Sequence, residues 1–407
     1  MKEHKMKDKK YRVISLFSGA GGMDLGFKQA GFDIVWANDF FKEACDTYRK
    51  NIGEIVYGDI TKIPSSDMPN NIDVVIGGFP CQGFSVANTK RSMEDKRNFL
   101  YLEMLRVIKD KNPKIFIAEN VKGITNIENG EVIKMIIKDF ESLGYKVDIQ
   151  LLNAAEYGIP QQRERVIIMG NRIGLDNIYP KKTHWLNEKD KTSKLKPAIT
   201  CKEAIEWLSD VKLSNNPIKN KNKTIYNHIA ATNVAETFWG RKYEVNQHDI
   251  CDYLKYWRNK SGWTTTKVDE HFGYSYTAGH WFRKDNNSGS IPSPDDWWEL
   301  KKILGFDDKY DKQVTTLVEK PITFEQSLRI TNWDRPSDTI TATSPEIHVN
   351  KKRRLSVREC AIIQTFPDDF VFTGSLSRMY TQVGNAVPVK LANKIAKCVE
   401  KMLDGKK

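Results

Sequence analysis

The chain has 407 residues, of which 40% are hydrophobic and 29% charged, and its formal net charge at pH 7 is +12. This length exceeds what one hydrophobic core usually serves, so we expect two domains, and apolar runs too short for a membrane span exclude a transmembrane protein. The positive charge favours a polyanionic partner, nucleic acid before a membrane surface, although a lysine-rich surface also serves solubility.

The cysteines give no sign of a disulfide framework or a zinc cluster. They stand at positions 45, 81, 201, 251, 360 and 398, and none forms a CxxC pair. The N-terminal residues 1–10 are charged and lack the apolar core of a signal peptide. We therefore expect a cytoplasmic protein without a bound metal.

Strands and helices alternate in the first 170 residues, because β-branched runs bounded by turn residues are separated by segments with helical spacing. This alternation predicts an α/β fold whose parallel sheet of about seven strands has right-handed crossovers. The expected strands are 12–17, 33–39, 55–57, 72–76, 114–118, one ending at Leu152, and 166–169. The expected helices are one ending at Gln29, 41–51, 99–109 and one ending at Leu143.

Residues 181–353 lose this alternation and are rich in Lys, Asn, Thr and Trp, which predicts a separate module. Within it, a helix at 263–272, a turn and a second helix at 277–283 have the shape of a helix-turn-helix, although an ordinary helical hairpin is the commoner explanation. Trp297 and Trp298 are expected in the core of this module. Helices are expected again at 356–364 and 389–403.

A glycine-rich loop, Phe17 to Asp24, follows the first strand and opens a helix. Such a loop lets a ligand approach the backbone, although a tight turn is the ordinary explanation. Asp24 occupies the last glycine position of the dinucleotide fingerprint, which disfavours NAD and FAD. Asp39 ends the second strand and suits ribose hydroxyls, while Asp59 follows the third strand and suits an adenine amino group. Three successive strand ends suited to adenosine favour a ligand site.

Cys81 follows the strand 72–76 within the segment Gly77 to Ser85. Pro80 has a fixed φ and no N–H, so Cys81 leaves the sheet on a stiff tether at the edge where α/β sheets bind ligands. An arbitrary intracellular cysteine is more often an inert buried one. The residues around Cys81 favour a reactive cysteine at a ligand site instead of an inert buried one.

Six segments in order resemble the motifs of the C5-cytosine DNA methyltransferase family. The resemblance spans nearly the whole chain except residues 181–330. The segments are Leu16–Gly22, Gly78–Ser85, Glu119–Val121, Gln161–Val166, Arg335–Thr341 and Gln382–Pro388.

This resemblance implies a Rossmann-like, S-adenosylmethionine-dependent sheet with a smaller target-recognition domain, acting on a cytosine flipped out of duplex DNA. Cytosine C5 is a poor nucleophile, so a thiolate, here that of Cys81, must first add to C6 while Glu119 bonds or protonates N3. The resemblance also implies that Arg165 holds Glu119 and the cytosine O2, and that Arg163 lies near the thiolate. We expect the two arginines to point to opposite faces; a surface ion pair with Glu164 is the alternative.

The resemblance also implies most of the binding residues; within the module it implies only that target readers lie there, and the residues given there are our candidates for the reading surface. Expected cofactor contacts are Phe17, Gly19, Gly21, Gly22, Asp39, Phe40, Asp59, Ile60, Pro80, Leu100, Asn385 and Ala386. Expected DNA contacts are Gln82, Ser85 and Arg97 in a loop that closes over the flipped base, and Tyr274, Tyr276, His280 and Arg283 in the module. The loop departs from the family pattern, because Asn98 stands where glycine is usual and Ala87 offers no hydroxyl.

We expect a catalytic and cofactor-binding domain at 1–180, a target-recognition domain at 181–353, a hinge at 354–378 and a return to the catalytic domain at 379–407. The expected protein is a monomer that acts on double-stranded DNA at the prokaryotic nucleoid, as the modifying counterpart of a restriction endonuclease. Two alternatives stay open. One is an RNA cytosine methyltransferase with the same motifs, and the other is a non-catalytic DNA-binding regulator.

Overall fold

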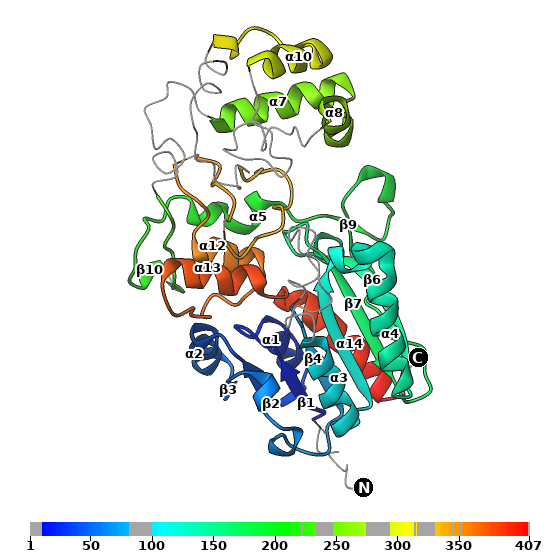
Figure 1. The fold of residues 1–407 in the computed structure, drawn as a ribbon. Coiled ribbons are helices and arrows are strands. Elements are labelled where there is room, and N and C mark those ends of the chain that lie inside the picture. Colours follow the sequence, from blue (N-terminus) through cyan, green and yellow to red (C-terminus); the bar gives the residue numbers. More distant parts are fainter. Residues whose placement is uncertain are drawn as a thin grey trace. The chain divides into compact units, whose positions relative to one another are not determined.

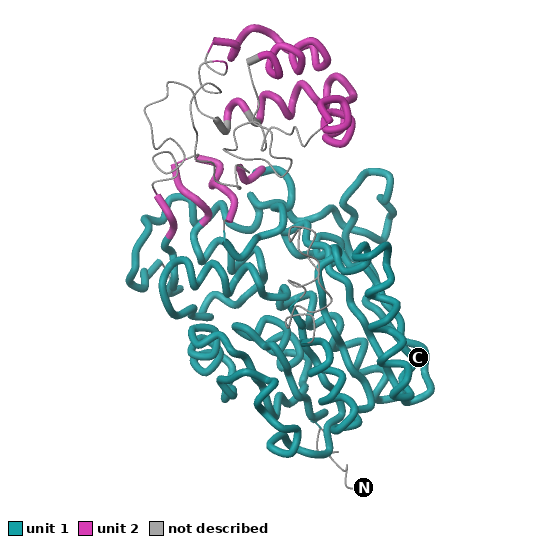
Figure 2. The backbone as a smooth tube through the Cα atoms, viewed as in Figure 1, with its two compact units in different colours: residues 1–229, 333–343, 356–407 teal, residues 230–332, 344–355 magenta. Residues whose placement is uncertain are grey.

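The structure, a computed structural model, describes residues 10–80, 100–220, 223–232, 247–273, 294–312, 315, 330–343, 345–350 and 352–405. The chain forms two compact units (Figure 2). Unit 1 comprises residues 1–229, 333–343 and 356–407, and unit 2 comprises 230–332 and 344–355. Residues 181–229, which the sequence analysis assigned to the second domain, therefore belong to unit 1.

A mixed sheet of seven strands forms the centre of unit 1 among the described residues, in the order β3-β2-β1-β4-β5-β7-β6. The strands form where β-branched runs predict them. Their bounds are β1 Arg12–Leu16, β2 Asp33–Asp39, β3 Val56–Tyr57, β4 Val74–Gly77, β5 Ile115–Val121, β6 Lys146–Asn153 and β7 Glu164–Asn171.

The expectation of a wholly parallel sheet is wrong at one edge. The strands from β3 to β5 pair in parallel, but β7 pairs antiparallel with both β5 and β6. The connection from β6 to β7, residues 154–163, contains no helix long enough for a crossover and returns the chain directly. As a result, β7 runs opposite to β5, and its first residues lie beside the last residues of β5.

Helices cover both faces of this sheet (Figure 1). The side chains of α3 and α4 pack with Val75 on one face, and those of α1 and α14 pack with Val74 and Ile76 on the other. Successive strand residues point to opposite faces, so Val75 packs into one hydrophobic core while its buried neighbours Val74 and Ile76 pack into the other. The helices of unit 1 are α1 Gly22–Gln29, α2 Lys42–Asn51, α3 Leu100–Lys111, α4 Glu131–Ser142, α5 Cys201–Ile205, α12 Val357–Ile363, α13 Leu376–Asn385 and α14 Val389–Leu403.

Further short strands belong to unit 1, and one of its helices, α13, differs from the prediction. The sequence predicts α12 and α14 but not α13, whose first turn is capped by the Ser375 side chain. The short strands pair as β8 with β9 and β10 with β11, and their bounds are β8 His184–Trp185, β9 Lys196–Pro197, β10 Ile218–Asn220 and β11 Lys223–Ile225.

The contact between α1 and α14 depends on the absence of a side chain at Gly26. A Cβ there would lie 2.5 Å from the Ala392 Cβ and 2.7 Å from the Asn393 nitrogen. We expect Gly26→Ala to lower the free energy of unfolding by about 1–3 kcal/mol, as overpacking does. Gly58→Ala is the control, because its Cβ would meet only Ile63 Cδ1 at 3.6 Å. Equal urea midpoints for the two variants would contradict this packing.

The described helices of unit 2 are α7 Gln247–Ser261, α8 Thr265–Phe272 and α10 Pro294–Leu304. Their apolar side chains form one core, in which Trp297 is fully buried. Trp298 is 46% exposed, so its predicted place in the core is wrong. The expected first helix of the helix-turn-helix corresponds to α8, which ends before Gly273; the second, at 277–283, lies outside the described residues.

No helix in the described ranges combines the length and apolarity needed to cross a membrane.

Candidate active site

A cavity of about 690 Å³ opens at the carboxyl edge of the sheet in unit 1. Its walls come from the glycine loop after β1, the ends of β2, β4 and β5, the start of β7, and α13 with the residues that follow it. Its size is within the usual range for a cofactor site. The edge is the one at which open α/β sheets bind their ligands.

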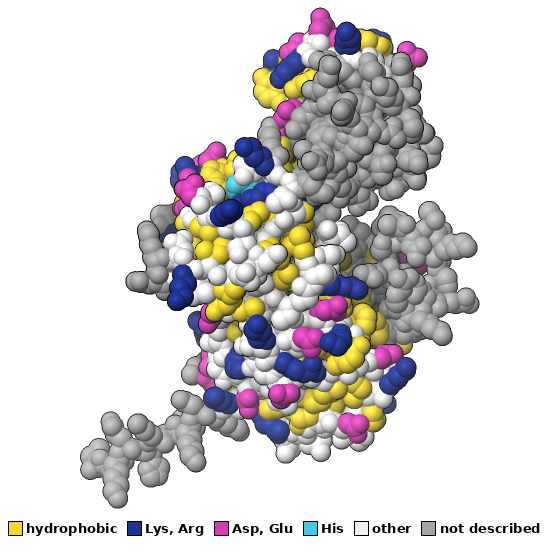
Figure 3. Space-filling view, turned by 90° about the vertical axis from the view of Figure 1, so that its left-hand side faces the viewer, with side chains coloured by type: hydrophobic (Ala, Val, Ile, Leu, Met, Phe, Trp, Pro, Cys, Tyr) yellow, Lys and Arg dark blue, Asp and Glu magenta, His cyan; other side chains and the backbone are white. Residues whose placement is uncertain are grey.

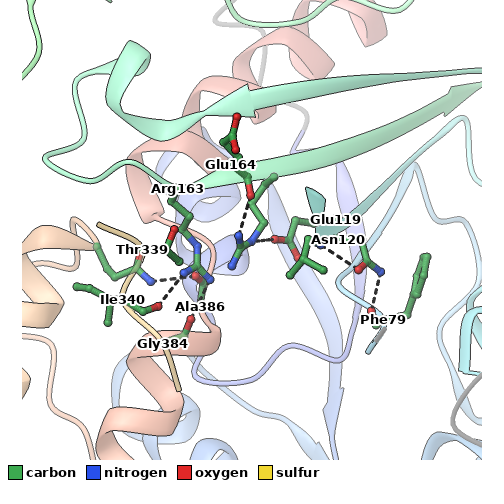
Figure 4. Close-up of polar contacts among 12 residues, drawn as sticks. Phe79, Glu119, Asn120, Arg163, Glu164, Thr339, Ile340, Gly384 and Ala386 are labelled. Atoms are coloured by element: carbon green, nitrogen blue, oxygen red, sulfur yellow. Dashed lines mark hydrogen bonds and ion pairs between the residues drawn. The ribbon is translucent and has the colours of Figure 1, made fainter. Parts of the chain in front are cut away.

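Glu119 and Arg165 form an ion pair in the wall of this cavity, with 2.7 Å between Arg165 Nε and Glu119 Oε1 (Figure 4). The antiparallel register places Arg165 opposite Val121 and Glu119 opposite Ile167, so the paired side chains are diagonal neighbours on one face. Both side chains are only 11% exposed, which shields their attraction from solvent. The structure thus brings together two residues that lie 46 positions apart.

Arg163 is fully buried and holds two segments of unit 1 against the start of β7. Its guanidinium donates to the carbonyls of Ile340 at 3.0 Å and Gly384 at 2.8 Å (Figure 4). Burial, followed by the charge of Arg165, lowers the pKa of Arg163 well below its ordinary value.

The expectation that the two arginines point to opposite faces is wrong, and the alternative of a surface ion pair with Glu164 is not found. Arg163 and Arg165 line the same cavity, because residues two apart in an extended chain share a face. Neither pairs with the Glu164 carboxylate, which pairs instead with Lys122 at 2.9 Å. The only atom of Glu164 to which Arg165 donates a hydrogen bond is the backbone carbonyl oxygen.

Asn120 ties the end of β5 to the segment that leads to Cys81. Its amide donates to the Phe79 carbonyl at 3.0 Å, and both Phe79 and Pro80 line the cavity. A Cβ at Gly78 would lie 3.1 Å from Glu119 Oε2, so glycine there leaves room for the carboxylate. The last described residue before Cys81 thus lies in the same wall as Glu119.

Several predicted site residues lie outside the described residues. They are Cys81, Gln82, Ser85, Arg97, Tyr274, Tyr276, His280 and Arg283. Their roles stay predictions.

The glycine loop and the end of β2 form the opposite wall. Gly19 has a φ of +56° and donates its N–H to Asp39 Oδ2 at 2.8 Å, while the Phe41 N–H donates to Oδ1 at 2.8 Å. Burial raises the pKa of Asp39, although these backbone donors oppose the rise. Phe17 also has a positive φ, +55°, and such strain in a residue other than glycine is typical of functional sites.

The predicted cofactor residues divide into two groups. Those that line the cavity are Phe17, Gly19, Gly22, Asp39, Phe40, Pro80, Asn385 and Ala386; Gly21, Asp59, Ile60 and Leu100 do not. A Cβ at Gly21 would lie 2.1 Å from Ile52 Cδ1, so Gly21 serves packing against the end of α2. The Asp59 carboxylate accepts bonds from the Thr61 N–H and hydroxyl, as a turn cap does.

Other wall residues were missed from the sequence. They include Asp24, Asn120, Arg378, Thr381 and Gln382. Asn120 belonged to a recognised motif, but its bond to a backbone carbonyl has no sequence signal. Gln382 also belonged to a recognised motif, whereas Arg378 and Thr381 had no sequence signal because helix α13 was not predicted.

Comparison with known proteins decides the family. The sequence model described as C-5 cytosine-specific DNA methylase matches residues 11–401. The chain belongs to this family. The type II methyltransferase M.FnuDI of Fusobacterium nucleatum is 35% identical, covering 97% of this chain and 96% of that protein. The type II methyltransferase M.NgoFVII of Neisseria gonorrhoeae is 34% identical, covering 96% of this chain and 86% of that protein.

Solved structures agree on the fold of this DNA methylase. A crystal structure of a prophage-encoded E. coli protein, assigned as a DNA modification methyltransferase, gives a TM-score of 0.59 at 22% identity and covers 97% of this chain and all of that one. The Entamoeba histolytica methyltransferase EhMeth gives 0.54 at 18% identity, covering 97% of this chain and 99% of that one.

The methylase is an enzyme of DNA cytosine-C5 methylation, and its methyl donor is S-adenosylmethionine. The cavity fits this donor in three respects. The glycine loop leaves open space beside Gly19, the buried Asp39 carboxylate lies in the same wall, and Phe40 offers a ring that is 69% exposed for contact with a base.

Proposed function

We propose that this chain is the modification enzyme of a restriction-modification system, which methylates one cytosine within a specific duplex sequence. The observation that carries the proposal is the Glu119–Arg165 pair, which lies in one cavity with the Pro80 tether of Cys81. The names of the bacterial relatives support the biological setting.

In this proposal Cys81 is the nucleophile and Glu119 the group that activates the base. The Cys81 thiolate adds to C6 of the flipped cytosine, and Glu119 stabilises the electron pair that moves toward N3. C5 then becomes nucleophilic enough to accept the methyl group. Loss of the C5 proton to water and of the sulfur from C6 restores the aromatic ring and the free thiolate.

Arg165 and Arg163 have different tasks. Arg165 orients the Glu119 carboxylate through its Nε and faces the cytosine O2, so it positions the activating group. Both terminal nitrogens of Arg163 donate hydrogen bonds to backbone carbonyls, so Arg163 fixes the cavity wall next to the reacting base. Its proximity to the thiolate, implied by the family, is part of the proposal.

The glycine-loop side of the cavity holds the cofactor. When bound, S-adenosylmethionine supplies an electrophilic methyl group on a positively charged sulfur. Asp39 accepts hydrogen bonds from its ribose, Phe40 contacts its adenine, and the backbone around Gly19 and Asn385 encloses the remainder. Asp59 and Ile60 stay candidates for contact with the adenine edge.

We assign target reading to unit 2 and to the loop that begins at Gln82. Arg97 and Ser85 in that loop, with Tyr274, Tyr276, His280 and Arg283 in unit 2, are the proposed DNA contacts. Not every lysine of unit 2 is available for phosphates, because Lys301 pairs with Asp308 and Asp311, and Lys302 with Glu299. Among the described residues drawn in Figure 3, basic side chains are scattered among acidic and apolar ones and form no continuous stripe.

The protein acts as a monomer in this proposal, because one recognition module reads an asymmetric target without a second copy. A restriction endonuclease is its functional counterpart and not a bound partner. Its place is with the DNA it methylates, in the prokaryotic cytoplasm at the nucleoid.

The test is methyl transfer from labelled S-adenosylmethionine to duplex DNA and, separately, to total tRNA. The expected result is label in DNA alone, with bisulfite sequencing assigning it to a cytosine in one short sequence. Label in tRNA alone would establish the RNA methyltransferase instead. DNA binding without transfer to either substrate would support the non-catalytic regulator.

A further inference from the structure

Asp24 is a fully buried carboxylate in the wall of the proposed cofactor cavity. It lies in the first turn of α1, directly after the glycine loop. Acidic side chains are almost never fully buried unless they are paired. A hydrogen-bond donor or a positive charge is therefore expected beside the Asp24 carboxylate.

The described neighbours of Asp24 satisfy only part of this requirement. The Tyr48 hydroxyl of α2 donates to Asp24 Oδ1 at 2.9 Å. The second oxygen, Oδ2, is buried without a hydrogen-bond partner among the described residues. A buried polar atom left in this state costs free energy unless something compensates for it.

No cation is among the groups of the described residues that shift the pKa of Asp24. The groups that act on the Asp24 carboxylate are the hydroxyls of Ser15 from β1 and Tyr48 from α2, its own backbone N–H, and the charge of Asp39 at the end of β2. Asp39 is itself acidic and lines the same side of the cavity. The glycine-loop side thus carries two carboxylates, whereas the arginines of the cavity wall come from other elements: Arg163 and Arg165 from the start of β7, and Arg378, which pairs with Glu43, from α13.

The methyl donor and its product differ in charge in a way that matches this side of the cavity. Both carry an ammonium and a carboxylate, but S-adenosylmethionine has a sulfonium cation where S-adenosylhomocysteine has a neutral thioether. We propose that Asp24 is a fixed counter-charge that makes the cavity bind S-adenosylmethionine more tightly than S-adenosylhomocysteine. The inference rests on the proposed function, because it needs the donor in this cavity. Since no atom of Asp24 is exposed, the residue acts through its charge and not by direct contact.

The counter-charge should titrate within the working range of the protein. Burial raises the pKa of Asp24 to about 6, although the Ser15 and Tyr48 hydroxyls act in the opposite direction. A bound cation favours the ionised carboxylate and lowers this pKa, so binding releases a proton near pH 6. Affinity for S-adenosylmethionine should therefore fall as the pH decreases through 6. The pKa of Asp39 is also raised, so Asp39 contributes to the pH dependence of the affinity in the same direction. The contribution of Asp24 is therefore the difference in pH dependence between the wild type and Asp24→Asn.

The test is isothermal titration calorimetry of both compounds with the full chain. At pH 8 we expect Asp24→Asn to weaken S-adenosylmethionine binding about tenfold and to change S-adenosylhomocysteine binding by less than about twofold, as the loss of one screened charge interaction would. Between pH 7.5 and 5.5 the affinity of the variant should fall less steeply than that of the wild type. Titrations in buffers of different ionisation enthalpy should show less proton release for the variant.

Two further variants separate charge from structure. Asp148→Asn is the matched control, because Asp148 on β6 also accepts a tyrosine hydroxyl, from Tyr179 at 2.6 Å, but does not line the cavity. It should leave both affinities unchanged. Tyr48→Phe removes the donor to Asp24 and should move the midpoint of the pH dependence upward while the preference for the donor persists at pH 8.

Equal weakening of both compounds by Asp24→Asn, or no change in either, would overturn the counter-charge role. If the wild type bound neither compound, the proposed function itself would be overturned, and this inference with it.

Discussion

Cys81→Ala is expected to abolish methyl transfer, with a loss of at least about 10⁴-fold in the single-turnover rate. Without a sulfur to add at C6, the cytosine ring stays aromatic and C5 cannot attack the methyl group. DNA binding should persist, because in this proposal it depends on unit 2 and on phosphate contacts and not on the thiol. Single-turnover incorporation of label and electrophoretic mobility shift of the target duplex measure the two properties separately.

Cys398→Ala is the control for this experiment. Cys398 is a buried cysteine that lies on α14 and not in the wall of the cavity. Its rate should stay within about twofold of the wild type, as for a conservative change away from a site. Transfer by Cys81→Ala at the wild-type rate would show that the nucleophile lies elsewhere.

Glu119→Gln is expected to lower the single-turnover rate by about 10²–10⁴-fold, the usual contribution of a positioned general acid. The amide keeps the shape of the side chain but cannot transfer a proton to N3. Arg165→Ala should approach the same loss, because removing one member of a shielded ion pair leaves the other charge unpaired, a change that costs about 3–5 kcal/mol in buried pairs.

The double variant shows whether the two residues act as a unit. If Arg165 works by orienting Glu119, Glu119→Gln/Arg165→Ala should be little worse than Glu119→Gln alone. Glu164→Gln is the matched control, because its carboxylate pairs with Lys122 at the surface and Arg165 uses only its backbone carbonyl. Losses that simply add in the double variant would refute a shared role.

Much of the sheet was predictable because β-branched runs and helical spacing alternate along the first 170 residues. The antiparallel pairing of β7 was not predictable, because the sequence does not show which strands pair across the connection from β6 to β7. That pairing matters for the site. It is the reversal of β7 that brings Arg165 beside Glu119, through the pairing of Val121 with Arg165.

The candidate site was predictable where ordered motifs supplied it and not where packing creates it. Glu119 and Arg165 follow from the motifs, whereas the bonds from Arg163 to Ile340 and Gly384 join parts of the chain that only the fold brings together. Asp24 had a sequence signal, since it replaces a glycine of a known fingerprint. That signal served to exclude NAD and FAD, and only burial beside Tyr48 showed an uncompensated charge.

A duplex that carries 5-fluorocytosine at the target position tests the central claim most directly, because fluorine at C5 cannot leave as the proton does. With S-adenosylmethionine present, the account predicts a denaturation-resistant protein–DNA adduct whose peptide map places the modification on Cys81. Efficient methylation of ordinary DNA without any adduct on the fluorinated duplex, or an adduct at another residue, would contradict it.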